Sequence, residues 1–235
     1  MAARLVEKIN RDFSNDAEER KRRMESRICK EGFLKVCVPG SCTALICAMT
    51  VSSPGMIQLL LENGANVNAT DINGNNPLVC ACVYNNVNTV KFWLKEFPDW
   101  DLEARNNVVG GMALGCAVFM GPNRLELTTL LLKHGAKIDT VTDTGSSILL
   151  SACANTDADP RVVKLLLKTH NHDINYRRRG TTMKWRLIQM VAKTTVRVMS
   201  NPGLLIKVLA EEDGATALHE SARRGDLEIV EVSFF

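Results

Sequence analysis

Aromatic residues are scarce in this chain, since Phe, Trp and Tyr together make up 5% of its 235 residues. Leu, Ala, Val and Cys must therefore supply most of the buried surface, which suits thin helical layers better than one thick core. A strong charge of one sign is also missing, and the net charge of +3 is too small to indicate a nucleic-acid surface. Because 46% of the residues are hydrophobic and 23% are charged, the composition is that of a folded chain.

Long apolar segments are missing as well. The N-terminus has no apolar core of a signal peptide. Residues 36–61 carry no charge, but Pro39-Gly40 and Pro54-Gly55 leave too short an apolar run for a membrane span. We therefore expect a cytoplasmic protein without membrane insertion. The basic run Arg20–Arg23 keeps a nuclear location open, although alternating Glu and Arg on a helix usually form a solvated face.

Two short elements recur along the chain. The first, with Leu at its third position, occurs as "TALICA" (43–48), "NPLVCA" (76–81), "MALGCA" (112–117), "SILLSA" (147–152) and "TALHES" (216–221). Its leucines are 33, 36, 35 and then 69 residues apart, so the last gap has room for one degenerate unit around Lys184. The second element is an amphipathic helix, found at 56–69, 90–104, 127–140, 162–175 and, more weakly, 204–213.

Proline marks the start of the second helix in four units. Pro54, Pro122, Pro160 and Pro202 follow Ser53, Gly121, Asp159 and Asn201, which we take as N-caps. A Gly-Ala pair ends this helix in "LLLENGANVNA" and "LLLKHGAKID", as expected of a C-cap.

These motifs resemble the ankyrin repeat, most closely in "DGATALHESARRGDLEIVEV" and "LLLENGANVNATDINGNNPL". The resemblance implies an all-α repeat solenoid of stacked helix-turn-helix units with short hairpin-like fingers. We expect a charged helical cap in 1–38, with its helix at 14–33, and an array over 39–235. The predicted units are 39–71, 72–106, 107–142, 143–178, a degenerate 179–212 and a truncated 213–235.

The last unit has a regular repeat sequence, but the spacing before it is short and no helix stop follows it. Leu209 and Leu218 are nine positions apart, whereas Leu61 and Leu78 are seventeen apart, so the finger before this unit is short by about one hairpin. Phe234 and Phe235 follow without a helix stop. We therefore expect this unit to fray or to associate through its uncapped end.

The sequence gives no catalytic, cofactor or metal site. Among the cysteines, Cys47, Cys80 and Cys116 recur at one position of the first helix and are expected to be buried hydrophobes. No CxxC motif and no phosphate-binding loop are present. His170 and His172 share a loop without a third ligand nearby in sequence.

The resemblance implies a protein partner bound by the finger tips and the concave face. The tip residues are Asp71, Ile72, Asn73, Asn106, Asn107, Val108, Asp143, Thr144, Arg177, Arg178 and Arg179, with Trp185 nearby. We expect the arginines to bind an acidic partner, because guanidinium groups form bidentate contacts with carboxylates. RNA as the ligand, or a merely solvated loop tip, are the alternatives for this basic patch.

Three classes of function stay open at this point. The first is a non-enzymatic scaffold or adaptor that binds another protein and no small-molecule substrate. The second is a regulatory ankyrin segment of a larger multidomain protein truncated after Phe235. The third is a nucleic-acid-associated or enzymatic protein that uses the basic patch or the thiols.

Overall fold

The structure is a computed structural model that describes residues 42–51, 53–155, 158–169, 173–199 and 213–234, together with 206 and 210. The predicted helix 14–33, His170, His172 and most of the predicted helix 204–213 lie outside these residues. All regular structure in the described part is helical, and the one β-bridge there joins Val141 to Ser147. None of its helices is long and apolar enough to cross a membrane.

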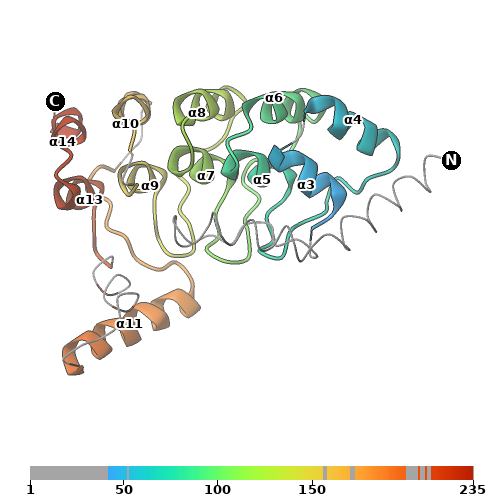
Figure 1. Ribbon diagram of the computed structural model, residues 1–235. Helices are drawn as coiled ribbons and strands as arrows, with labels where there is room; N and C mark the ends of the chain where they lie inside the picture. Colours follow the sequence, from blue (N-terminus) through green and yellow to red (C-terminus); the bar gives the residue numbers. More distant parts are fainter. Residues whose placement is uncertain are drawn as a thin grey trace.

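Among the described residues, five helix pairs stack side by side in two layers (Figure 1). The inner layer consists of α3 (Ala44–Val51), α5 (Pro77–Val83), α7 (Ala113–Phe119), α9 (Ile148–Cys153) and α13 (Ala217–Arg224). The outer layer consists of α4 (Pro54–Glu62), α6 (Val87–Glu96), α8 (Arg124–Lys133), α10 (Pro160–Lys168) and α14 (Leu227–Phe234). Each helix packs on its neighbour in the same layer, as expected of a solenoid.

Local capping explains where the inner helices begin. Asn76, Ser147 and Thr216 accept hydrogen bonds from the backbone N–H groups of Val79, Leu150 and His219, three residues further on. Small buried residues such as Ala81 and Ala117 let these helices approach one another closely. The inner layer is therefore thin, as the composition predicts.

Two of the four predicted starts of the outer helices are confirmed, and the one at Asn201 and Pro202 lies outside the described residues. Pro54 and Pro160 occupy the first turns of α4 and α10, after N-caps Ser53 and Asp159. The prediction for Gly121 is wrong, because α8 begins at Arg124 with Asn123 as its N-cap. Gly121 instead has a φ of +71°, and its Cα faces the Asn85 side chain of the preceding unit.

The longer loop after α6 has a packing reason. Phe97 and Trp100 lie against the fully buried Trp93, with ring centroids 4.5 and 5.0 Å from the Trp93 ring. These rings form the aromatic cluster of the second unit. The extra residues of "LKEFPDWDLEA" thus supply core surface that the shorter loops lack.

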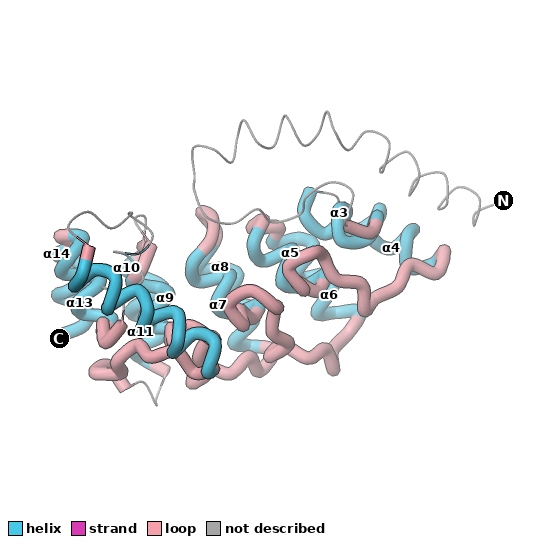
Figure 2. The backbone as a smooth tube through the Cα atoms, turned by 90° about the horizontal axis from the view of Figure 1, so that it is seen from below, coloured by secondary structure: helices cyan, strands magenta, loops and turns pink. Residues whose placement is uncertain are grey.

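The predicted degenerate repeat at 179–212 does not form a unit of the stack, and that prediction is wrong. Helix α13 packs directly on α9, and α14 packs on α10. Residues 183–198 form one 16-residue helix, α11 (Met183–Val198), which lies below both layers in Figure 1 and in front of them in Figure 2.

Backbone hydrogen bonds show that 179–212 is an insertion in a finger. In the first finger, Asp71 N–H donates to the Asn75 carbonyl and Gly74 N–H donates to the Asp71 carbonyl. Arg178 makes the same two bonds with Ala215 and Gly214, at 2.9 and 2.8 Å. The finger before the last unit is therefore complete, and its two halves are separated in sequence by the insertion.

Candidate protein-binding surface

The fingers are joined into one continuous row. Asn107 N–H donates to the Asn73 carbonyl at 2.8 Å, and Asp143 N–H donates to the Val109 carbonyl at 2.7 Å. Thr181 N–H continues the row by donating to the Asp143 carbonyl at 2.9 Å. Because one backbone bond links each finger to the next, the tips form a fixed surface along one side of the array (Figure 2).

Three of the predicted tip residues are buried inside the fingers. Asp71 is 5% exposed, and its Oδ1 accepts hydrogen bonds from the N–H groups of Asn73 and Asn75. Asn106 is 9% exposed, and its Oδ1 accepts from three backbone N–H groups of its own finger. Thr144 is also buried, with its hydroxyl 2.8 Å from that of Thr142. These side chains hold the turns in shape and are not available to a partner.

Other predicted residues lie at the surface. Ile72 is 63% exposed and Val108 is 40% exposed, while Asn107 is exposed and Asn73 is half-buried. The first two tips therefore offer an apolar side chain each, beside neutral polar groups. Isolated apolar side chains are common on protein surfaces, so exposure alone does not indicate a binding site. The equivalent positions of Ile72 and Val108 on neighbouring tips are the stronger indication.

Asp143 at the third tip is neutralised within the chain. The Arg105 guanidinium lies 3.1 Å from the Asp143 carboxylate and donates a second hydrogen bond to the Val141 carbonyl at 2.8 Å. Sequence reasoning missed Arg105, because no local pattern pairs residues 38 positions apart. The pair links the second and third fingers and removes a negative charge from the row.

The three arginines of the basic patch have different environments. Arg177 and Arg179 are exposed, whereas Arg178 is half-buried and donates to the Thr144 hydroxyl at 3.4 Å. Trp185 is half-buried on α11. Arg177 and Arg179 are therefore accessible to a partner, whereas the Arg178 side chain is engaged within the finger.

The thiols in the described part of the chain do not form a reactive centre. Cys80, Cys82 and Cys153 are buried, while Cys47 and Cys116 are half-buried. Burial raises the pKa of the Cys116 thiol to about 12 and, with smaller effects of nearby charges, that of Cys153 to about 11. Such thiols stay protonated near neutral pH and are poor nucleophiles. Across the described ranges, no three His, Cys, Asp or Glu residues are grouped to hold a metal ion.

The two histidines within the described ranges have local structural partners. His134 Nδ1 lies 2.9 Å from the Leu130 carbonyl oxygen, and His219 Nδ1 lies 2.7 Å from the Thr216 hydroxyl. Each contact is within one turn of its own helix. Both rings therefore make local contacts at the ends of their own helices.

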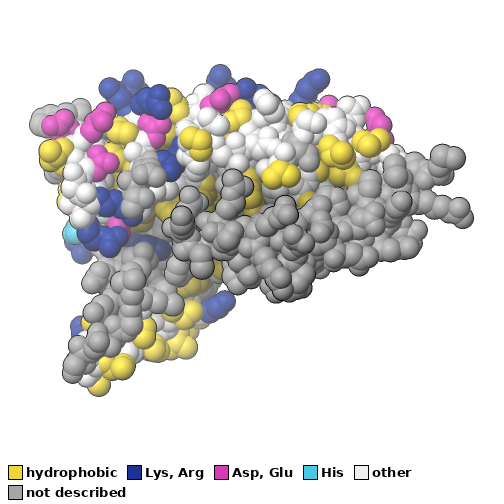
Figure 3. Space-filling model, in the orientation of Figure 1, with side chains coloured by type: hydrophobic (Ala, Val, Ile, Leu, Met, Phe, Trp, Pro, Cys, Tyr) yellow, Lys and Arg dark blue, Asp and Glu magenta, His cyan; other side chains and the backbone are white. Residues whose placement is uncertain are grey.

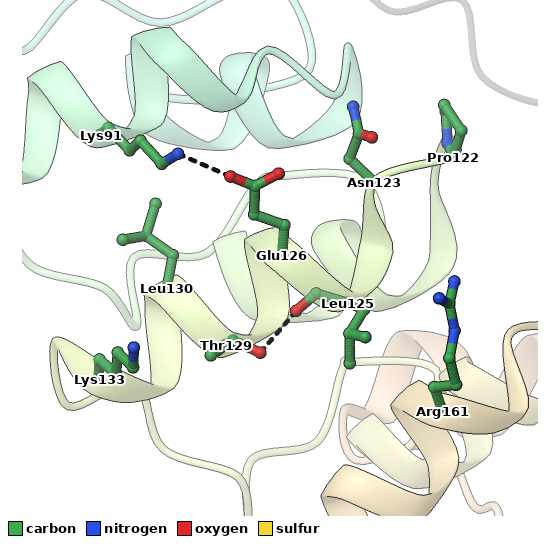
Figure 4. A pocket seen from close by; sticks show the side chains of 9 residues that line it. All are labelled: Lys91, Pro122, Asn123, Leu125, Glu126, Thr129, Leu130, Lys133 and Arg161. Carbon is green, nitrogen blue, oxygen red and sulfur yellow. Dashed lines mark hydrogen bonds and ion pairs between the residues drawn. The ribbon is translucent and has the colours of Figure 1, made fainter.

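A groove is lined by residues of α6, α8 and α10 in the outer layer (Figure 4). This layer lies on the opposite side of the array from the fingers (Figure 1). Its lining residues are Lys91, Pro122, Asn123, Leu125, Glu126, Thr129, Leu130, Lys133 and Arg161. Glu126 is ion-paired with Lys91 at 2.6 Å, and the Thr129 hydroxyl donates to the Leu125 carbonyl at 2.7 Å. The one carboxylate and the one hydroxyl that line the groove are therefore both engaged, and they do not form a nucleophile–base pair.

The comparison with known families agrees with this architecture. A family model described as ankyrin repeats (3 copies) matches residues 28–106. The match begins inside the segment 1–38 and ends at the second finger, and the same stacking continues to α14. No curated protein matches the sequence. Ankyrin repeats are generally protein–protein interaction modules. Residues 28–106 therefore belong to the ankyrin-repeat family.

Proposed function

We propose that this protein is a non-enzymatic scaffold or adaptor that binds another protein along the row of fingers and the adjoining concave face. One observation carries the proposal: the hydrogen-bonded row presents Ile72, Asn107 and Val108 and ends at two exposed cations, Arg177 and Arg179. A surface that is rigid, partly apolar and charged at one end suits a partner of defined shape.

The charge of the row favours an acidic patch on that partner. Asp143 is already paired with Arg105, so the exposed Arg177 and Arg179 face little competing negative charge at the neighbouring tip. Guanidinium groups bind carboxylates with two parallel hydrogen bonds, which adds orientation to attraction. We therefore expect these two arginines to set the position of the partner on the row.

The test compares two charge reversals in the full chain. Arg177→Glu combined with Arg179→Glu alters the finger end, and Lys164→Glu combined with Lys168→Glu makes the same charge change on the outer helix α10, where both lysines are exposed. Partners recovered by affinity capture are identified and their Kd values are measured. We expect the finger variant to weaken binding by about tenfold or more, and the α10 variant to leave it unchanged.

Equal affinity of the finger variant and the wild type would contradict this assignment. RNA binding is measured in parallel at two salt concentrations, because contacts with phosphates weaken steeply as salt rises. If RNA binds in a salt-dependent way and this binding is lost in the finger variant, the ligand of the row is a nucleic acid and not a protein. Arg178 is left unchanged in both variants, since its side chain belongs to the finger.

A further inference from the structure

Helix α11 has two opposite faces with the same spacing but different environments. Trp185, Gln189 and Ala192 are half-buried or buried, at positions i, i+4 and i+7. Met183, Leu187 and Met190 have the same spacing on the other side and are 80%, 56% and 56% exposed. One face of the helix therefore packs against the fingers, and the opposite face is apolar and exposed to solvent.

The apolar face, which we call the α11 stripe, continues along the helix. It consists of Met183, Leu187, Met190, Val191 and Val198, with the exposed Thr194 on the same face between the last two. Figure 3 shows hydrophobic side chains gathered on this outer part of α11. A 16-residue helix is about 24 Å long, so the stripe offers several apolar anchors in one line. Exposed apolar residues arranged like this mark an interaction site more than scattered ones do.

The inner face fixes the orientation of the stripe. Gln189 Oε1 accepts from Gly180 N–H at 2.9 Å, and Gln189 Nε2 donates to the Thr144 carbonyl at 3.3 Å. Arg186 Nε donates to the Gly180 carbonyl at 2.9 Å, and Lys193 is ion-paired with Asp213. Because these bonds join α11 to both ends of the insertion and to the third finger, the helix is held with the stripe outward.

The charges of α11 indicate the chemistry of its partner. The helix carries Lys184, Arg186, Lys193 and Arg197 and no acidic residue. On a helical projection, Lys184 lies at one edge of the stripe and Arg186 and Arg197 lie at the other. A partner must therefore provide an apolar surface with acidic groups beside it.

Two other occupants fit this pattern less well. Pairing of α11 with a second copy would bring two such sets of cations together with no carboxylate on either helix. A bilayer surface favours aromatic anchors, but the one aromatic residue of α11, Trp185, lies half-buried on the opposite face. An acidic protein with a groove for one helix face meets both the charge and the shape.

We propose that α11 is a docking helix for an acidic protein that opens a methionine-lined apolar groove, the chemistry of calcium-loaded EF-hand sensors. The stripe mixes Met, Leu and Val side chains, and flexible methionines in such a groove adapt to an uneven apolar surface. This site is separate from the finger row, so the scaffold would carry a second, calcium-dependent contact.

The test uses calmodulin as the probe and the full chain as the ligand. Binding is measured by isothermal titration with calcium and with a calcium chelator. The variant Leu187→Gln with Met190→Gln removes two anchors of the stripe. The control, Met56→Gln with Leu59→Gln, makes the same changes on α4, where these side chains are 43% and 44% exposed. We expect micromolar or tighter binding in calcium, at least about tenfold weaker in the stripe variant and unchanged in the control.

Three results would overturn the proposal. One is the absence of calcium-dependent binding by the wild-type chain, and another is equal weakening by the α4 control. The third is binding to phosphatidylserine-containing vesicles that depends on the stripe while calmodulin does not bind, which would make α11 a membrane-surface helix. Circular dichroism of both variants confirms that any loss of binding is not a loss of folding.

Discussion

Gln189 of the insertion donates a hydrogen bond to the Thr144 carbonyl of the third finger, although the two residues are 45 positions apart in sequence. The side chain is 6% exposed and also accepts from Gly180 N–H. This one amide therefore connects α11, the finger that leads into it and the finger before. Its contacts suggest a direct test of how the insertion is held.

Gln189→Leu should loosen α11 without unfolding the stack. The change leaves a buried N–H and a buried carbonyl without their side-chain partner, which costs about 1–3 kcal/mol. Hydrogen exchange should then be faster in residues 183–198. Gln58→Leu is the control, because Gln58 is exposed on α4. Unchanged exchange in the Gln189 variant would show that other contacts hold the helix.

Gly145→Ala should destabilise the protein more than Gly135→Ala. Both glycines have positive φ, +85° and +90°, so alanine is strained at either position. A Cβ on Gly145 would overlap the Arg179 backbone, whereas a Cβ on Gly135 meets nothing within 4 Å. We expect a loss of about 1 kcal/mol at Gly135 from strain alone and a larger loss at Gly145, measured by denaturant unfolding. Equal losses would mean that the fingers can move apart at no cost.

Ile229→Ala should lower the free energy of unfolding by about 2–5 kcal/mol, because Ile229 is fully buried where α14 meets the array. Leu227→Ala is the matched control in the same helix, since Leu227 is 76% exposed and its truncation should change stability by less than about 0.5 kcal/mol. Denaturant unfolding of both variants measures the difference. Similar small effects would support our expectation that the last unit frays, which is still a prediction.

Stability should fall at alkaline pH partly through Cys153. Its folded pKa of about 11 lies above the ordinary thiol value, so the folded state holds the proton more tightly than the unfolded state does. The contribution is fully present below about pH 9 and is lost at about 1.4 kcal/mol per pH unit as pH rises toward 11. Urea unfolding from pH 8 to 11 should show a shallower decline in Cys153→Ala than in the wild type. Parallel declines would contradict this effect.

Local signals along the sequence correctly indicated most of the array. Asparagine, serine and threonine caps, the prolines before α4 and α10 and the repeated leucines act over a few residues, so their effect is visible without tertiary contacts. The resemblance to the ankyrin repeat implied the finger tips, and of these Ile72, Val108, Arg177 and Arg179 are exposed. It did not separate them from Asp71, Asn106 and Thr144, because hydrogen bonding inside a turn is not visible in residue type alone.

Residues 179–212 show what local signals could not decide. The spacing of 69 residues between Leu149 and Leu218 suits two units as well as one unit and an insertion. The stripe at Met183, Leu187 and Met190 is a usable signal for one long helix, but the repeat register placed a degenerate unit around Lys184. Sequence by itself determined the helix pairs, their caps and the ankyrin architecture, because each depends on neighbours within one unit. Only the tertiary structure decided that α13 stacks on α9 and that α11 lies outside the two layers. Which helices pack together depends on the apolar surface that each pair can bury, and this is not visible within one unit of the sequence.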